Sequence, residues 1–144
     1  MYRRMMIVLL LLGAGVPAAA KEETLDQLKE KAARASVRDQ PKIFLELAER
    51  HLEAANTAYD AGEVEKGREA VEEVASYSEK AGNAAIQARK HMKQVEIKVR
   101  RMERKLSDIR RAVTFEDRAS LEAAIQRMEK IRANLLRAMF GTDL

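Results

Sequence analysis

Between Val64 and Val113, apolar residues recur at alternating steps of three and four residues. The fifteen positions of this series are Val64, Gly67, Val71, Val74, Ser78, Ala81, Ala85, Ala88, Met92, Val95, Val99, Met102, Leu106, Ile109 and Val113. All but Gly67 and Ser78 are apolar, which makes thirteen of the fifteen. Such a heptad repeat places one face of a helix against neighbouring helices. Because its phase does not change at Gly82-Asn83, we predict one long central helix over about residues 63–113. The alternative is a hairpin that turns at Gly82-Asn83, since Gly and Asn are common turn residues.

Shorter helices are expected to fold antiparallel on each half of the long one. Residues 41–60 form the first, with Asp39 as a possible cap, Pro41 in the first turn and Gly62 ending the helix. A composition with only 4% aromatic residues also favours helices over sheets. The predicted fold class is therefore all-α, a coiled-coil-like bundle built on a long central helix.

Two further helices are predicted, over residues 24–35 and 120–140. Thr24 and Gln27 have the spacing of a capping box at the start of the first. Ser120 can cap the second, and Gly141 can end it. We expect the 120–140 helix to fold back over Met92 to Ile109.

The first twenty residues have the plan of a secretory signal peptide. A basic start, "MYRR", precedes the apolar run "MMIVLLLLGAGV", and Ala18 and Ala20 form a small-residue cleavage site. The run is shorter than the roughly 20 residues that span a bilayer. We predict a signal peptide over residues 1–20, a single helical domain over residues 21–144, and an exported protein that is periplasmic or extracellular. No second apolar run follows, so no integral membrane span is expected after cleavage.

The residues give no catalytic or metal-binding pattern. The chain has no cysteine and only two histidines, His51 and His91, which fall on different predicted helices. The Glu-x-x-His arrangement of bundle di-iron sites does not occur. We therefore expect a protein that is not an enzyme and has no catalytic residues, bound metal or other cofactor.

The segment "HLEAANTAYDAGEVEKGREAVEEVASYSEKA" resembles one tetratricopeptide-repeat unit over about residues 48–81. Ala55 and Gly67 stand where such units need small side chains, and "AYDAGEVEKG" is similar to their turn. The usual Trp and closing Pro are missing, and no second copy follows. The resemblance implies a helical hairpin used for protein contact.

Charge is distributed unevenly along the chain. From Lys21 to Ala88 there are 10 basic and 15 acidic residues, and from Arg89 to Arg111 there are 10 basic and 3 acidic ones. Six basic residues fall opposite the apolar seam: Lys90, Lys93, Arg100, Arg101, Arg104 and Arg111. They form either a solvated outer face or a strip that docks on an anionic partner: lipid head groups, surface polysaccharide or an acidic protein. Without interleaved aromatic residues, and in an exported protein, nucleic acid is not expected.

The middle of the seam is rich in alanine. The two flanking helices are ~30 Å long each, too short to cover the long helix together. The helix over residues 24–35 can fill the gap, or else Ala81, Ala85 and Ala88 form a groove for a partner. We predict a non-catalytic protein-interaction or scaffold protein of the cell envelope, with self-association as one form of contact. A periplasmic holdase chaperone and a binder of anionic envelope surfaces through residues 89–111 are the alternatives.

Overall fold

The computed structural model describes residues 22–141 and confirms the all-α fold class for them. Its helices are α1 (Leu25–Arg34), α2 (Gln40–Asp60), α3 (Val64–Ala88), α4 (Met92–Ala112) and α5 (Arg118–Phe140), with a 3₁₀ turn, η1 (Phe115–Asp117), before α5. The predicted signal peptide, with its cleavage site at Ala18 and Ala20, lies outside the described residues.

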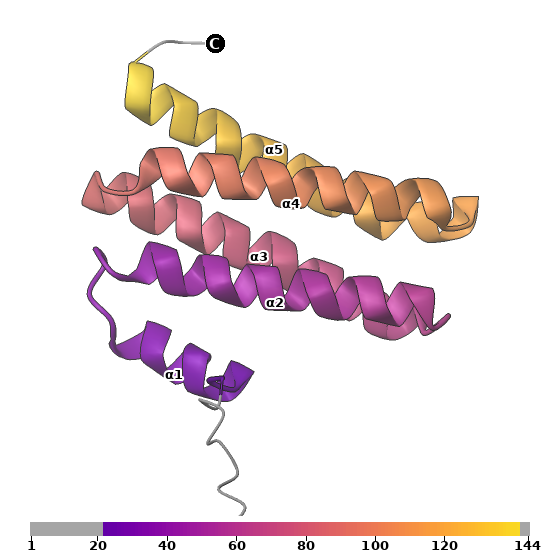
Figure 1. Cartoon of the computed structure of the whole chain (residues 1–144). Coiled ribbons are helices and arrows are strands. Elements are labelled where there is room, and N and C mark those ends of the chain that lie inside the picture. Colours follow the sequence, from indigo (N-terminus) through magenta and orange to yellow (C-terminus); the bar gives the residue numbers. More distant parts are fainter. Residues whose placement is uncertain (1–21, 142–144) are drawn as a thin grey trace, which may run out of the picture.

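Helices α2 to α5 form an antiparallel bundle in which each helix reverses the direction of the one before it (Figure 1). Helix α3 packs on α2 and α5, and α4 packs on α5 and, less extensively, on α2. Helices α2 and α4 therefore run in the same direction on one face of the bundle. The hairpin expected from residues 48–81 is present as α2 and α3, while its tetratricopeptide-like character stays a prediction.

Helix α1 is a short addition beside α2 (Figure 1). The predicted capping box is confirmed, since Thr24 Oγ1 accepts from the Gln27 N–H at 3.2 Å and Gln27 Oε1 accepts from the Thr24 N–H at 2.9 Å. Leu28 and Ala32 are buried on its inner side. Helix α1 does not fill the middle of the α3 seam, as we had considered from the sequence, because its principal neighbour is α2.

The prediction of one continuous helix over residues 63–113 is not confirmed. The chain turns at Arg89–His91, where Arg89 and His91 adopt left-handed φ values of 52° and 64°. The Lys90 N–H donates to the Ala85 carbonyl at 3.1 Å and the Arg89 N–H donates to the Ile86 carbonyl at 3.2 Å. This is the Schellman pattern that ends helices, with arginine at the position where glycine is usual. Neither glycine nor proline marks the turn in the sequence.

The predicted heptad register is nevertheless the core of the bundle. Its interior positions are buried, from Gly67 to Ala85 in α3 and from Val95 to Ile109 in α4, while Val64, Ala88, Met92 and Val113 at the helix ends are half-buried. The three-residue turn fits into one four-residue step of the heptad, from Ala88 to Met92, so the phase continues although the chain reverses. The repeat therefore identified the inward face correctly but did not report the chain direction.

Gly82 lies inside α3 and is buried, not at a turn. A Cβ atom built on it would lie 2.7 Å from Ile131 Cδ1, closer than van der Waals contact allows. Helix α5 thus passes so close to α3 that no side chain fits between them at this position. The glycine serves a close helix crossing, which is its second common role beside turns.

The remaining helix ends follow the sequence prediction in part. Gly62 and Gly141 have φ values of 73° and 62° and end α2 and α5, as predicted. Helix α5 begins at Arg118, so Ser120 lies within its first turn and is not the cap. Asp39 also forms no side-chain cap and instead accepts a hydrogen bond from Ser36 Oγ at 2.9 Å.

Two arginines of α5 tie it to the neighbouring helices: Arg127 pairs with α3, and Arg132 pairs with α4. Arg132 binds Glu96 at 3.1 Å and Glu103 at 2.9 Å, both on α4. Glu96 is buried, and a buried carboxylate needs such a partner to offset its lost hydration. These ion pairs set the level of α5 against α4.

Candidate interaction surfaces

A groove of about 970 Å³ lies between α2 and α4, on the face where the two helices run in the same direction. We call it the α2–α4 groove. Its lining residues are Glu49, Leu52, Glu53, Asn56, Tyr59 and Asp60 from α2, Lys98, Arg101, Met102, Lys105, Asp108, Ile109 and Ala112 from α4, and Val113 at the end of α4. The groove exists because α2 and α4 are neighbours with limited mutual packing.

The floor of this groove is apolar. Leu52, Met102 and Ile109 are buried there, each less than a tenth exposed. Tyr59 and Val113, both half-buried, extend this apolar surface at the end where α2 and α4 finish. These three core positions thus leave only a small part of their surface open to the groove, whereas Tyr59 and Val113 leave more.

The two walls carry opposite charge. The ionisable residues of the α2 wall are Glu49, Glu53 and Asp60, whereas those of the α4 wall are Lys98, Arg101, Lys105 and Asp108. One ion pair crosses the groove, from Lys98 Nζ to Glu49 Oε1 at 3.1 Å. It links the two helices across the groove. It leaves the other charged groups along the groove facing solvent.

Four of these groups have no ion-pair partner within 4.0 Å among residues 22–141. They are Glu53 and Asp60 on the α2 wall, and Arg101 and Lys105 on the α4 wall, all exposed. Elsewhere on the bundle, several arginines are paired across helices, as Arg127 is with Glu72 and Glu79. The two walls of the groove therefore carry exposed charges of opposite sign that are not neutralised by ion pairs among the described residues.

The six basic residues predicted from the sequence fall into three groups. Successive residues of a helix are about 100° apart, so Lys93, Arg100, Arg104 and Arg111 share one side of α4, within about 40°. Arg100 is paired with Glu96 at 3.7 Å and Arg111 with Asp108 at 3.4 Å. We call these four residues the basic row. None of them lines the α2–α4 groove.

The other two predicted residues lie elsewhere. Arg101 lines the α2–α4 groove, together with Lys98 and Lys105, which were not among the six. Lys90 is exposed in the turn between α3 and α4. The structure therefore does not assemble the six residues into one continuous strip.

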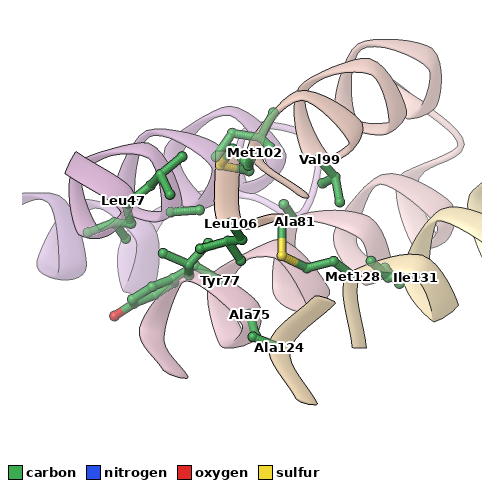
Figure 2. Close-up of a cluster of buried hydrophobic side chains, with 14 of the residues drawn as sticks. Leu47, Ala75, Tyr77, Ala81, Val99, Met102, Leu106, Ala124, Met128 and Ile131 are labelled. Carbon is green, nitrogen blue, oxygen red and sulfur yellow. The ribbon is translucent and has the colours of Figure 1, made fainter. Parts of the chain in front are cut away.

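The alanine groove predicted at Ala81, Ala85 and Ala88 is closed in the structure. Ala81 and Ala85 have no exposed surface, and Ala88 is half-buried. Figure 2 shows Ala81 in one buried cluster with Met128 and Ile131 of α5. The expected shortfall in cover does not arise, because α3 and α4 are separate helices of 25 and 21 residues that pack on each other and on α5.

His51 is half-buried on α2 and packs against α3. Its ring stacks on Tyr77 with 5.6 Å between centroids, and its Nε2 atom is buried without a hydrogen-bond partner among the described residues. Burial lowers the pKa of His51; Glu73 acts in the opposite direction and Lys29 acts with burial. A neutral, stacked imidazole of this kind is a packing residue.

His91 is remote from His51 in the sequence, at the α3–α4 turn, where its Nδ1 atom lies 3.0 Å from Gln94 Oε1. Within residues 22–141, no three His, Cys, Asp or Glu side chains converge to hold a metal ion. None of the described helices combines the length and apolarity needed to cross a bilayer.

The acidic wall of the α2–α4 groove was missed by sequence reasoning. Glu53 and Asp60 are ordinary polar positions on the outer side of a predicted helix, and nothing local distinguishes them. These two residues form an acidic wall only because the fold places α2 beside α4, which carries Arg101 and Lys105 about 45 residues later in the chain. The signal in the sequence was the contrast between an acidic first half and a basic second segment.

Comparison of the chain with protein-family models, with curated proteins and with solved structures finds no match in any of the three.

Proposed function

We propose that this protein is an exported, non-catalytic helical interaction protein that binds a partner protein in the α2–α4 groove. The carrying observation is that groove itself: an apolar floor, about 970 Å³ of open volume, and walls with unpaired charges of opposite sign. The signal-peptide pattern of residues 1–20 supports export, and the resemblance of residues 48–81 to a repeat unit used for protein contact supports the partner class.

The pattern of the groove fits protein recognition better than catalysis. Four of its charged groups, which are Glu53, Asp60, Arg101 and Lys105, are exposed and have no oppositely charged group within 4.0 Å among the described residues. General acid–base chemistry instead needs groups positioned within hydrogen-bond reach of a reacting atom. Apolar surface surrounded by complementary charge is the usual anatomy of a protein contact, where charges guide association and apolar groups supply affinity.

Site-specific photo-crosslinking in the producing cells tests this proposal. A photoreactive amino acid replaces Asn56, which is exposed and lines the groove, or Asn83, which is exposed on α3 and does not. We expect a discrete crosslinked species of higher mass from position 56 and none from position 83. Crosslinking that is absent or equal at both positions would contradict the assignment of the groove.

The basic row supports a second candidate, contact with anionic envelope surfaces. Lys93 and Arg104 have no carboxylate partner within 4.0 Å in the described part of the chain, so their charge is available. Co-sedimentation with vesicles containing anionic lipid is expected for the wild type and reduced for Lys93→Glu/Arg104→Glu. Equal sedimentation with uncharged vesicles would rule out this candidate.

A further inference from the structure

We infer that the partner enters the α2–α4 groove as an amphipathic helix, with basic residues along its edge facing α2 and acidic residues along its edge facing α4. This inference rests on the proposed function and specifies the chemistry of the partner. It is carried by the nature of the walls, the length of the groove and the placement of its unpaired charges.

The walls favour a helical occupant over an extended one. Both are α-helices, whose backbone N–H and C=O groups are already paired within the helix. A peptide strand laid between them would find no backbone partners, and its own buried polar groups would stay unsatisfied. A helix satisfies its backbone internally and presents only side chains, as in other helix-in-groove complexes.

The groove has the length of a short helix. Its lining residues run from Glu49 to Asp60 on α2 and from Lys98 to Val113 on α4. At 1.5 Å per residue, these segments are roughly 17 and 22 Å long. An occupant of three to four turns spans that distance.

The charges select the edges of that helix. Glu53 and Asp60 attract a basic edge, whereas Arg101 and Lys105 attract an acidic one, and none of the four is neutralised by an ion pair among the described residues. A ligand of one sign, such as a polyanion, is attracted by one wall and repelled by the other. The groove therefore discriminates by the arrangement of charge and not by net charge.

Designed peptides test this directly. Three 21-residue peptides share leucine at heptad positions a and d and differ at the flanking positions e and g: one carries Lys at e and Glu at g, one Glu at both, one Lys at both. Reversing the two edges would only reverse the direction of binding, so the controls carry a single charge on both edges. Fluorescence anisotropy with nanomolar labelled peptide keeps the peptides monomeric. We expect the mixed-edge peptide to bind at least tenfold more tightly than either control.

A charge change in the α2 wall should switch this preference. In Glu53→Lys/Asp60→Lys both walls are basic, so the peptide with Glu on both edges becomes the tightest ligand and the mixed-edge peptide loses at least tenfold. The matched control is Glu122→Lys/Glu129→Lys, which makes the same charge change at exposed positions of α5 outside the groove. It should keep the wild-type preference. All four positions are exposed, so the variants are expected to keep the helical circular dichroism of the wild type.

Several results would overturn the inference. One is equal or undetectable binding of all three peptides at 100 μM protein, and another is a preference that the Glu53→Lys/Asp60→Lys variant does not change. Sedimentation showing a dimer that this variant dissociates would assign the groove to a second copy of the chain instead. If crosslinking from Asn56 persists while the peptides fail, the groove still binds a protein, and only the chemistry of the occupant is wrong.

Discussion

The substitution Gly82→Ala tests the closest helix crossing in the bundle. The new Cβ atom would lie 2.7 Å from Ile131 Cδ1, nearer still to Ile131 Cγ1, and 3.6 Å from Leu135 Cδ1. Ile131 is 3% exposed, and a β-branched side chain in a helix has essentially one χ1 rotamer. It cannot swing out of the way, so α5 must shift away from α3 or Ile131 must leave its preferred conformation.

Two effects of opposite sign decide the magnitude. Replacing glycine by alanine inside a helix stabilises it by about 1 kcal/mol. Overpacking a filled core costs about 1–3 kcal/mol, and we take about 2 kcal/mol because the contact involves a stiff, buried side chain. The net expectation is a loss of about 1 kcal/mol, equivalent to a decrease of about 4 °C in Tm for a domain of this size.

Asn83→Ala is the matched control. Asn83 follows Gly82 in α3 but is exposed, so alanine there gains helix propensity without meeting another helix. It should stabilise the protein by about 0.5 kcal/mol. Urea denaturation followed by circular dichroism measures both variants. A Gly82→Ala protein as stable as Asn83→Ala would refute the close crossing.

A double-mutant cycle with Ile131→Ala isolates the contact itself. Ile131→Ala alone should cost about 2–5 kcal/mol, because it leaves a cavity. In the Gly82→Ala background the cost should be smaller by at least about 1 kcal/mol, since the new methyl group no longer clashes and fills part of that cavity. A coupling energy near zero would show that the two residues do not meet.

Three further predictions concern the turn, the core and pH. Arg89→Gly should stabilise the protein by about 1 kcal/mol in urea denaturation by relieving a left-handed φ of 52°, whereas Lys90→Gly should not; equal effects would refute the turn geometry. Ser78→Ala should stabilise by about 1 kcal/mol, because the buried hydroxyl has no partner among the described residues; a loss would reveal a hydrogen bond. Burial lowers the pKa of His51 below 6.5, so the unfolded chain binds a proton at this residue more readily than the folded chain does. The contribution of His51 to the free energy of unfolding is therefore complete above pH 6.5 and is lost as the pH falls towards the folded-state pKa. The stability advantage of wild type over His51→Gln should therefore shrink from pH 7.5 to pH 5.5, and a constant difference would contradict this.

The sequence was a good guide to which residues face the core and a poor one to where the chain reverses. A heptad repeat marks which residues are buried. The residues of the repeat are buried in both α3 and α4, so the repeat could not distinguish one long helix from two antiparallel ones. The turn at Arg89–His91 uses non-glycine residues with positive φ, which are uncommon and leave no compositional mark. Gly82 attracted attention as a turn residue, while its role is a close contact with Ile131 that only the tertiary structure reveals.

Only the basic wall of the candidate site could be predicted in part from the sequence. The basic residues of α4 stand out in the sequence. Arg101 was predicted as part of a continuous basic strip, whereas the structure places it in the lining of the α2–α4 groove. The groove itself depends on which helices become neighbours and how tightly they pack. The opposite charge of the α2 and α4 walls is a consequence of that pairing, which Lys98 and Glu49 bridge with one ion pair. It cannot be obtained from either segment alone.

The position of α5 has a consequence for the order in which the chain acquires its structure. Helix α5 packs extensively on both α3 and α4, and contacts between α3 and α4 themselves are fewer. A nascent chain that ends before Arg118 has a completed α2–α3 hairpin, but the apolar residues of α3 and α4 that α5 covers remain exposed. Helix α5, which emerges after α1 to α4, is therefore the helix that closes the bundle. Until it is available, the intermediate exposes apolar surface that can aggregate or bind a chaperone.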